Sequence, residues 1–79
     1  MKPETIQYRL KRLGIKQYEI AAAIGASEVM IHKAIHGNTP NEALIKTVLA
    51  VAQGQVSLEE AANFYASSIS TQEPVNVLE

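Results

Sequence analysis

The chain has 79 residues, which is enough for one domain with a small core. It contains no cysteine and carries a net charge of −1, which excludes a disulfide framework, a thiolate metal site and a uniformly basic chain. The sequence shows no secretory signal and no apolar run long enough to cross a membrane, so we expect a cytoplasmic protein.

The first predicted helix runs from Pro3 to Leu13. Proline suits a first helical turn, because its fixed φ angle fits the helix and because the backbone N–H that proline lacks would have no partner in that turn. Ile6, Leu10 and Leu13 recur at a helical spacing and form a stripe to be buried. Gly14 is expected to end this helix.

The charge is unevenly divided along the chain. All seven lysines and arginines lie in the first 46 residues with four glutamates, so this segment carries +3, whereas four further glutamates make the rest −4. Arg9, Lys11, Arg12 and Lys16 gather at the end of the first helix and in the loop after it. They can meet phosphates or form a solvated helix face.

Two short helices joined by a tight turn are predicted between Gln17 and Gly37. Gly25 ends the first of them, because a steep crossing after so few residues needs a positive φ angle. Ser27 is a good N-cap for the second. The predicted helices are Gln17 to Ile24 and Glu28 to His36, with Ile20, Ala21, Ile24, Ile31, Ala34 and Ile35 on their buried faces.

Two more helices follow, each with a predicted capping box. In the first box Thr39 is the N-cap, Pro40 the first helical residue and Glu42 the reciprocal acid. The apolar face of this fourth helix is expected to consist of Leu44, Ile45, Val48, Leu49 and Ala52, with Gly54 after its end.

The fifth helix is predicted from Leu58 to about Ser68, with Ser57 and Glu60 in its capping box and Val56 as a hydrophobic staple. The domain thus covers residues 1–69. Residues 70–79 are expected to form a flexible tail, of which the last two resemble a cloning remnant.

Eight positions are spaced as in helix-turn-helix domains: Gln17, Ile20, Ala21, Ile24, Gly25, Ser27, Ile31 and Gly37. Over roughly residues 4–66 the chain resembles the Cro and lambda-repressor (XRE) family. The resemblance implies an all-α, compact five-helix domain whose third helix enters the major groove of duplex DNA. It further implies a small transcriptional regulator, a repressor of phage or plasmid type.

The DNA-binding residues expected on this basis are Arg12, Lys16, Gln17, Ser27, Glu28, Val29, His32, Lys33, His36 and Asn38. Glu28 can accept a hydrogen bond from a cytosine amino group, or simply place a favourable charge at a helix N-terminus. Val29 can touch a thymine methyl group, and Lys33 can meet a phosphate or a guanine. Ser27 can cap its helix and also donate to a phosphate.

His32 and His36 lie one helical turn apart, as in some metal sites. With Glu28 they would form an open, weak site on a single helix, so we expect no metal and no cofactor. Imidazoles that face DNA predict an affinity that rises as the pH falls from about 8 to 6. No catalytic residues are expected, because Ser27, His32 and Glu28 share one helix without an oxyanion loop.

A single small module usually needs two copies for useful specificity, so we expect a homodimer. The candidate contact is the fifth helix, through Leu58, Phe64, Tyr65 and Ile69. The alternative is that these side chains pack on the first helix. Two other functions stay open: a protein-interaction module that lost DNA contact, and an architectural or recombination accessory factor.

Overall fold

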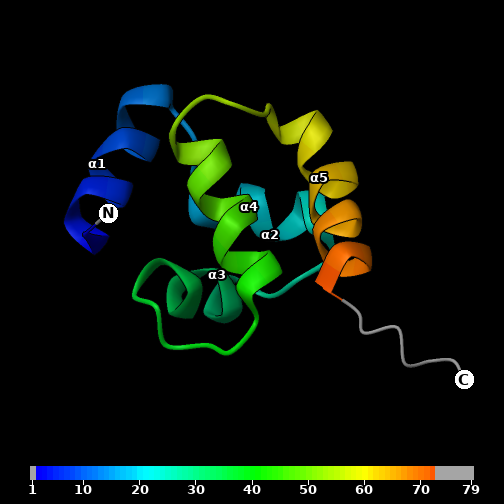
Figure 1. Cartoon of the computed structure of the whole chain (residues 1–79). Helices are drawn as coiled ribbons and strands as arrows, with labels where there is room; N and C mark the ends of the chain where they lie inside the picture. Colours follow the sequence, from blue (N-terminus) through cyan, green and yellow to red (C-terminus); the bar gives the residue numbers. More distant parts are fainter. Residues whose placement is uncertain (1, 73–79) are drawn as a thin grey trace, which may run out of the picture.

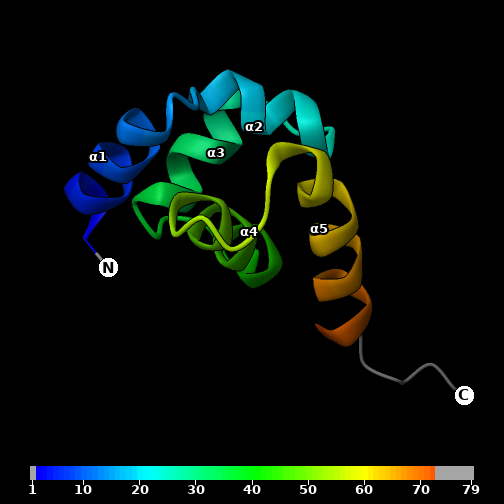
Figure 2. The same ribbon diagram turned by 90° about the horizontal axis from the view of Figure 1, so that it is seen from above.

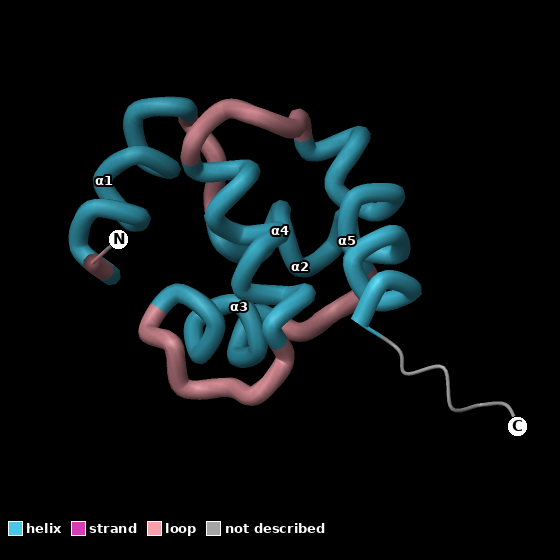
Figure 3. Tube along the Cα trace, viewed as in Figure 1, coloured by secondary structure: helices cyan, strands magenta, loops and turns pink. Residues whose placement is uncertain are grey.

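The computed structural model describes residues 2–72, which fold into five α-helices without a strand in that range (Figures 1 and 3). The helices are α1 (Pro3–Leu13), α2 (Gln17–Ile24), α3 (Glu28–Ile35), α4 (Glu42–Ala52) and α5 (Leu58–Gln72). The all-α prediction is therefore confirmed. No helix within residues 2–72 has both the length and the apolar character needed to cross a membrane.

The first three helices begin and end close to the predicted positions. Gly14 and Gly25 follow α1 and α2 in the left-handed conformation, with φ angles of 73° and 75°. At Gly25 this lets the chain reverse within three residues, so that α3 starts beside α2. Helix α3 stops at Ile35, one residue before the predicted end, and His36 is its C-cap.

The predicted start of α4 is wrong by two residues. The N-cap is Asn41, whose side-chain oxygen accepts a hydrogen bond from the Leu44 N–H at 3.1 Å. Thr39 instead accepts from the Asn41 N–H at 3.2 Å, before the helix begins. The Asn41 amide also donates to the Tyr65 hydroxyl of α5 at 3.0 Å, a contact that a local capping rule does not include.

The start of α5 is as predicted, but its end is not. Ser57 and Glu60 form the predicted capping box, with hydrogen bonds of 3.1 and 3.2 Å between each backbone N–H and the other side chain. The helix then continues to Gln72 rather than ending near Ser68. Residues 70–72 of the expected tail are thus helical, whereas residues 73–79, with the suspected cloning remnant, lie outside the described range.

Helix α4 is the centre of the fold, because it packs against α1, α3 and α5 (Figure 1). Of its predicted apolar face, Ile45 and Leu49 are only half-buried, whereas four residues outside that face are buried: Ala43, Thr47, Ala50 and Val51. The prediction of a single apolar face is therefore too narrow. The buried Thr47 hydroxyl donates to the Ala43 carbonyl at 2.8 Å, which satisfies the one polar core side chain among residues 2–69.

Helix α5 packs on α2 and α4 and lies across the molecule from α1 (Figures 1 and 2). The alternative that its apolar side chains pack on the first helix is therefore wrong. Leu58 and Tyr65 pack at the edge of the core, Phe64 is half-buried, and Ile69 is 39% exposed. A dimer contact through this helix stays a prediction.

Candidate nucleic-acid interface

The N-terminus of α2 and the exposed face of α3 share one surface depression. Gln17 of α2 lines it with Glu28, Val29 and His32 of α3, around a volume of about 270 Å³. The three α3 residues are exposed because Ile31, Ala34 and Ile35 turn the opposite face of the helix into the core. Four of the predicted DNA-binding residues are thus brought together.

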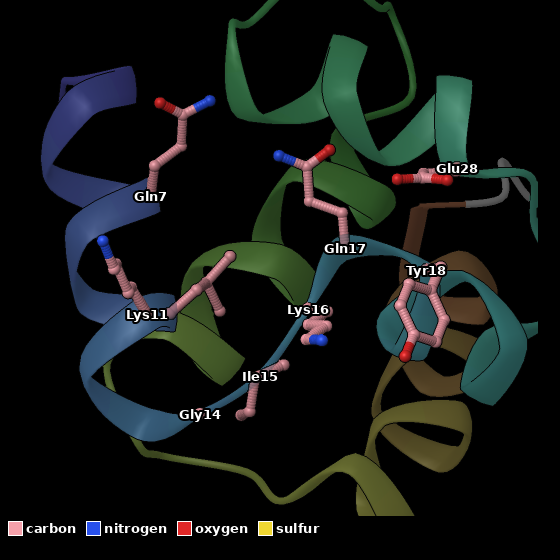
Figure 4. A pocket seen from close by; sticks show the side chains of 9 residues that line it. Gln7, Lys11, Gly14, Ile15, Lys16, Gln17, Tyr18 and Glu28 are labelled. Carbon is pink, nitrogen blue, oxygen red and sulfur yellow. The ribbon is translucent and has the colours of Figure 1, made fainter.

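A larger groove of about 480 Å³ continues this surface toward α1 (Figure 4). Its lining residues are Gln7, Leu10, Lys11, Gly14, Ile15, Lys16, Gln17, Tyr18 and Glu28. Gln17 and Glu28 line both hollows, so the two form one continuous surface. We call this surface the α2–α3 face, and it carries two lysines and one carboxylate.

The beginning of α2 holds its polar groups in place. The Glu19 carboxylate accepts a hydrogen bond from the Lys16 backbone N–H at 2.8 Å and therefore faces the chain rather than the groove. The Lys16 ammonium lies 5.9 Å from the centre of the Tyr18 ring, within range of a weak cation–π contact. The Lys16 ammonium group thus lies at the groove, next to an exposed aromatic ring.

Ser27 caps α3 as predicted. Its hydroxyl oxygen accepts a hydrogen bond from the Met30 N–H at 3.2 Å, and the residue is exposed. A serine hydroxyl that accepts still has its own proton to donate. The capping role is thus confirmed, and the geometry leaves the hydroxyl able to contact a phosphate at the same time.

The two histidines of this region lie against each other at the end of α3. The ring centres of His32 and His36 are 4.4 Å apart, with an angle of 48° between the planes, and both residues are exposed. Within residues 2–72 no three acidic or histidine side chains are grouped as metal ligands. His32 lines the smaller hollow, so the pair lies beside the α2–α3 face.

The other predicted residues lie at the margin of this surface or away from it. Lys33, His36 and Asn38 are exposed but line neither hollow, and the Asn38 N–H donates to the Lys33 carbonyl at 2.8 Å. Arg12 lines a different groove, on the other flank of α1. The structure therefore separates Arg12 from Lys11 and Lys16, which line the α2–α3 face.

Two polar residues of the α2–α3 face, Gln7 and Tyr18, were missed by the sequence analysis, and Lys11 was named there only as a possible phosphate contact. Gln7 and Lys11 are four positions apart and so project from one side of α1. This spacing was a usable signal, but which side of α1 faces α2 depends on how the helices pack. The sequence around Tyr18 contained no signal that would identify it as a site residue, other than its large ring next to Gln17.

Searches of protein-family models, curated proteins and solved structures find no significant match to this chain. The function proposed below is therefore based on the side chains of the α2–α3 face and on the family resemblance of the sequence.

Proposed function

We propose that the protein binds duplex DNA with the exposed face of α3 in the major groove, as a small transcriptional regulator of the cytoplasm. The observation that carries this proposal is the shared depression of Gln17, Glu28, Val29 and His32. It unites the start of α2, which can meet the phosphate backbone, with a helix face that can meet base edges.

The cations of the surface supply the contacts that do not depend on sequence. Lys11 and Lys16 line the larger groove, and Lys33 is exposed on α3. Each can neutralise one phosphate and release its counterions. Gln17, at the N-terminus of α2, adds an uncharged contact that fixes the orientation on the duplex.

Sequence discrimination comes from the first turn of α3. The exposed Glu28 carboxylate accepts a hydrogen bond from a cytosine amino group, and Val29, which is 63% exposed, packs on a thymine methyl group. Neither residue is needed for the core, so both are free to serve recognition.

Regulation follows from occupation of a promoter by two copies, with α5 as the proposed dimer contact. A single domain of this size covers little DNA, and paired half-sites one helical turn apart, about 34 Å, compensate for that. Ile69 on α5 is an exposed apolar side chain available for such a contact.

The test is selection of bound sequences from a random duplex pool, followed by fluorescence anisotropy at several salt concentrations. Three phosphate-contacting lysines in each subunit predict a slope of log K against log salt of about −3 per subunit. Lys16→Gln and Lys33→Gln each reduce that slope by about 1. The matched control is Lys46→Gln, an exposed lysine of α4 that lines no hollow described above. Absence of binding at low salt, or an equal loss in the control, contradicts the proposal.

A further inference from the structure

A second groove of about 480 Å³ lies on the other flank of α1. It is lined by Thr5, Tyr8, Arg9, Arg12 and Leu13 of α1 and by Ala52 at the end of α4. None of these residues lines the α2–α3 face, and none of them is acidic. We call this surface the α1 outer groove. It is a second basic surface that the proposed DNA contact does not use.

Helix α1 sends its basic side chains to two different sides. Successive residues of a helix are rotated by about 100°, so the neighbours Lys11 and Arg12 point apart. Ile6 and Leu10 form the buried stripe between the two flanks, whereas the prediction that Leu13 is buried with them is wrong. Lys11 accordingly lines the α2–α3 face, whereas Arg9 and Arg12 line the outer groove.

The outer groove is apolar as well as basic. Tyr8 is 58% exposed and Leu13 is 49% exposed, although both are large hydrophobic side chains. The Arg12 guanidinium lies 5.7 Å from the Tyr8 ring centre, and its Nη1 donates to the Tyr8 hydroxyl at 3.0 Å. The guanidinium therefore lies beside the ring, so the charged and the apolar parts of the groove adjoin each other.

We propose that the α1 outer groove docks an acidic segment of a partner protein that carries an apolar side chain. Carboxylates of the segment pair with Arg9 and Arg12, since a guanidinium can bind a carboxylate through two parallel hydrogen bonds. The apolar side chain packs on Tyr8 and Leu13, and tyrosine and arginine are residues that often dominate binding energy.

A protein partner fits this groove better than a second stretch of DNA does. A phosphate backbone would pair with the arginines but would leave Leu13 and the Tyr8 ring without apolar partners. The groove is small, so the contact belongs to the weak and transient class. The proposal does not depend on DNA binding, and the two surfaces can be tested separately.

The test uses the full ¹⁵N-labelled chain and the synthetic peptide EDLEWED, with QNLQWQN and EDSESED as controls. We expect amide shifts centred on the outer groove with EDLEWED and much smaller shifts with either control. In anisotropy titrations Arg12→Gln and Leu13→Ser each weaken the peptide complex by about tenfold. The adjacent Lys11→Gln leaves peptide affinity unchanged and weakens DNA binding, whereas Leu13→Ser leaves DNA binding unchanged.

Four results would overturn the proposal. The first is no peptide shift in the outer groove, and the second is equal binding of QNLQWQN. The third is a duplex that shifts the outer-groove amides itself, which would make the groove a DNA surface. The fourth is self-association of the chain that Arg12→Gln abolishes, which would make a second copy the occupant. None of these four results affects the outcome of the Lys11→Gln test of DNA binding.

Discussion

Ser27 allows the folding role and the proposed DNA role of one side chain to be separated. Its hydroxyl oxygen accepts from the Met30 N–H at 3.2 Å, and α3 has only eight residues. Loss of a serine cap costs about 1 kcal/mol. For a domain of this size, that corresponds to a fall in Tm of about 4–8 °C. Ser27→Ala is expected to show this fall, measured by circular dichroism.

Ser27→Asp distinguishes the two roles, because aspartate caps a helix as well as serine does but cannot donate to a phosphate. We expect nearly unchanged stability. Loss of a hydrogen bond to a charged group costs about 1.5–3 kcal/mol, and repulsion adds about 1 kcal/mol near the surface. Affinity for a selected duplex should therefore fall by about 2.5–4 kcal/mol, which is roughly 50-fold or more, since tenfold corresponds to about 1.4 kcal/mol.

The matched control is Ser57→Ala, which removes an equivalent cap from α5, where Ser57 accepts from the Glu60 N–H at 3.2 Å. It should lower stability by about the same amount as Ser27→Ala and leave duplex affinity unchanged. Wild-type stability in Ser27→Ala would refute the capping bond. Wild-type duplex affinity in Ser27→Asp would refute the phosphate contact.

Two further predictions concern a tertiary hydrogen bond and the histidine pair. Asn41→Ala removes both the α4 cap and the hydrogen bond to Tyr65, so urea unfolding should show a free energy of unfolding that is lower by about 2 kcal/mol. Tyr65→Phe removes only the hydrogen bond and keeps the cap, so it should lower the free energy of unfolding by about 1 kcal/mol. Equal losses in the two variants would contradict this division. His32 lines the smaller hollow and lies against His36, so replacement of both histidines by alanine should weaken duplex binding at fixed salt. Unchanged duplex affinity in that double variant would place the pair away from DNA.

Much of the secondary structure was predictable because helix ends depend on neighbouring residues. Pro3 and Gly14 mark the ends of α1, and Ser57 with Glu60 marks the start of α5, since capping bonds span only three residues. The same local reasoning failed at Asn41. There Thr39 and Pro40 are also residue types that start a helix. The residue that caps α4 is Asn41, which also donates a hydrogen bond to Tyr65 from a distant part of the chain.

The candidate site was predictable in part for a similar reason. The sequence by itself determined which residues of α3 are exposed, because Ile31, Ala34 and Ile35 define the buried side of that helix by their spacing. It could not assign Lys11 and Arg12 to different surfaces. Both belong to one basic cluster in the sequence, and only the packing of α1 against its neighbours decides which flank faces α2.

The burial of α4 shows the same division. Its helical character and its leucine and valine content follow from the sequence, but the burial of Ala43, Thr47 and Val51 does not. Those positions are covered because α4 has α1, α3 and α5 around it. Local hydrogen bonding and periodicity thus determined the five helices, whereas contacts between distant segments decided the core, the two surfaces of α1 and the position of α5.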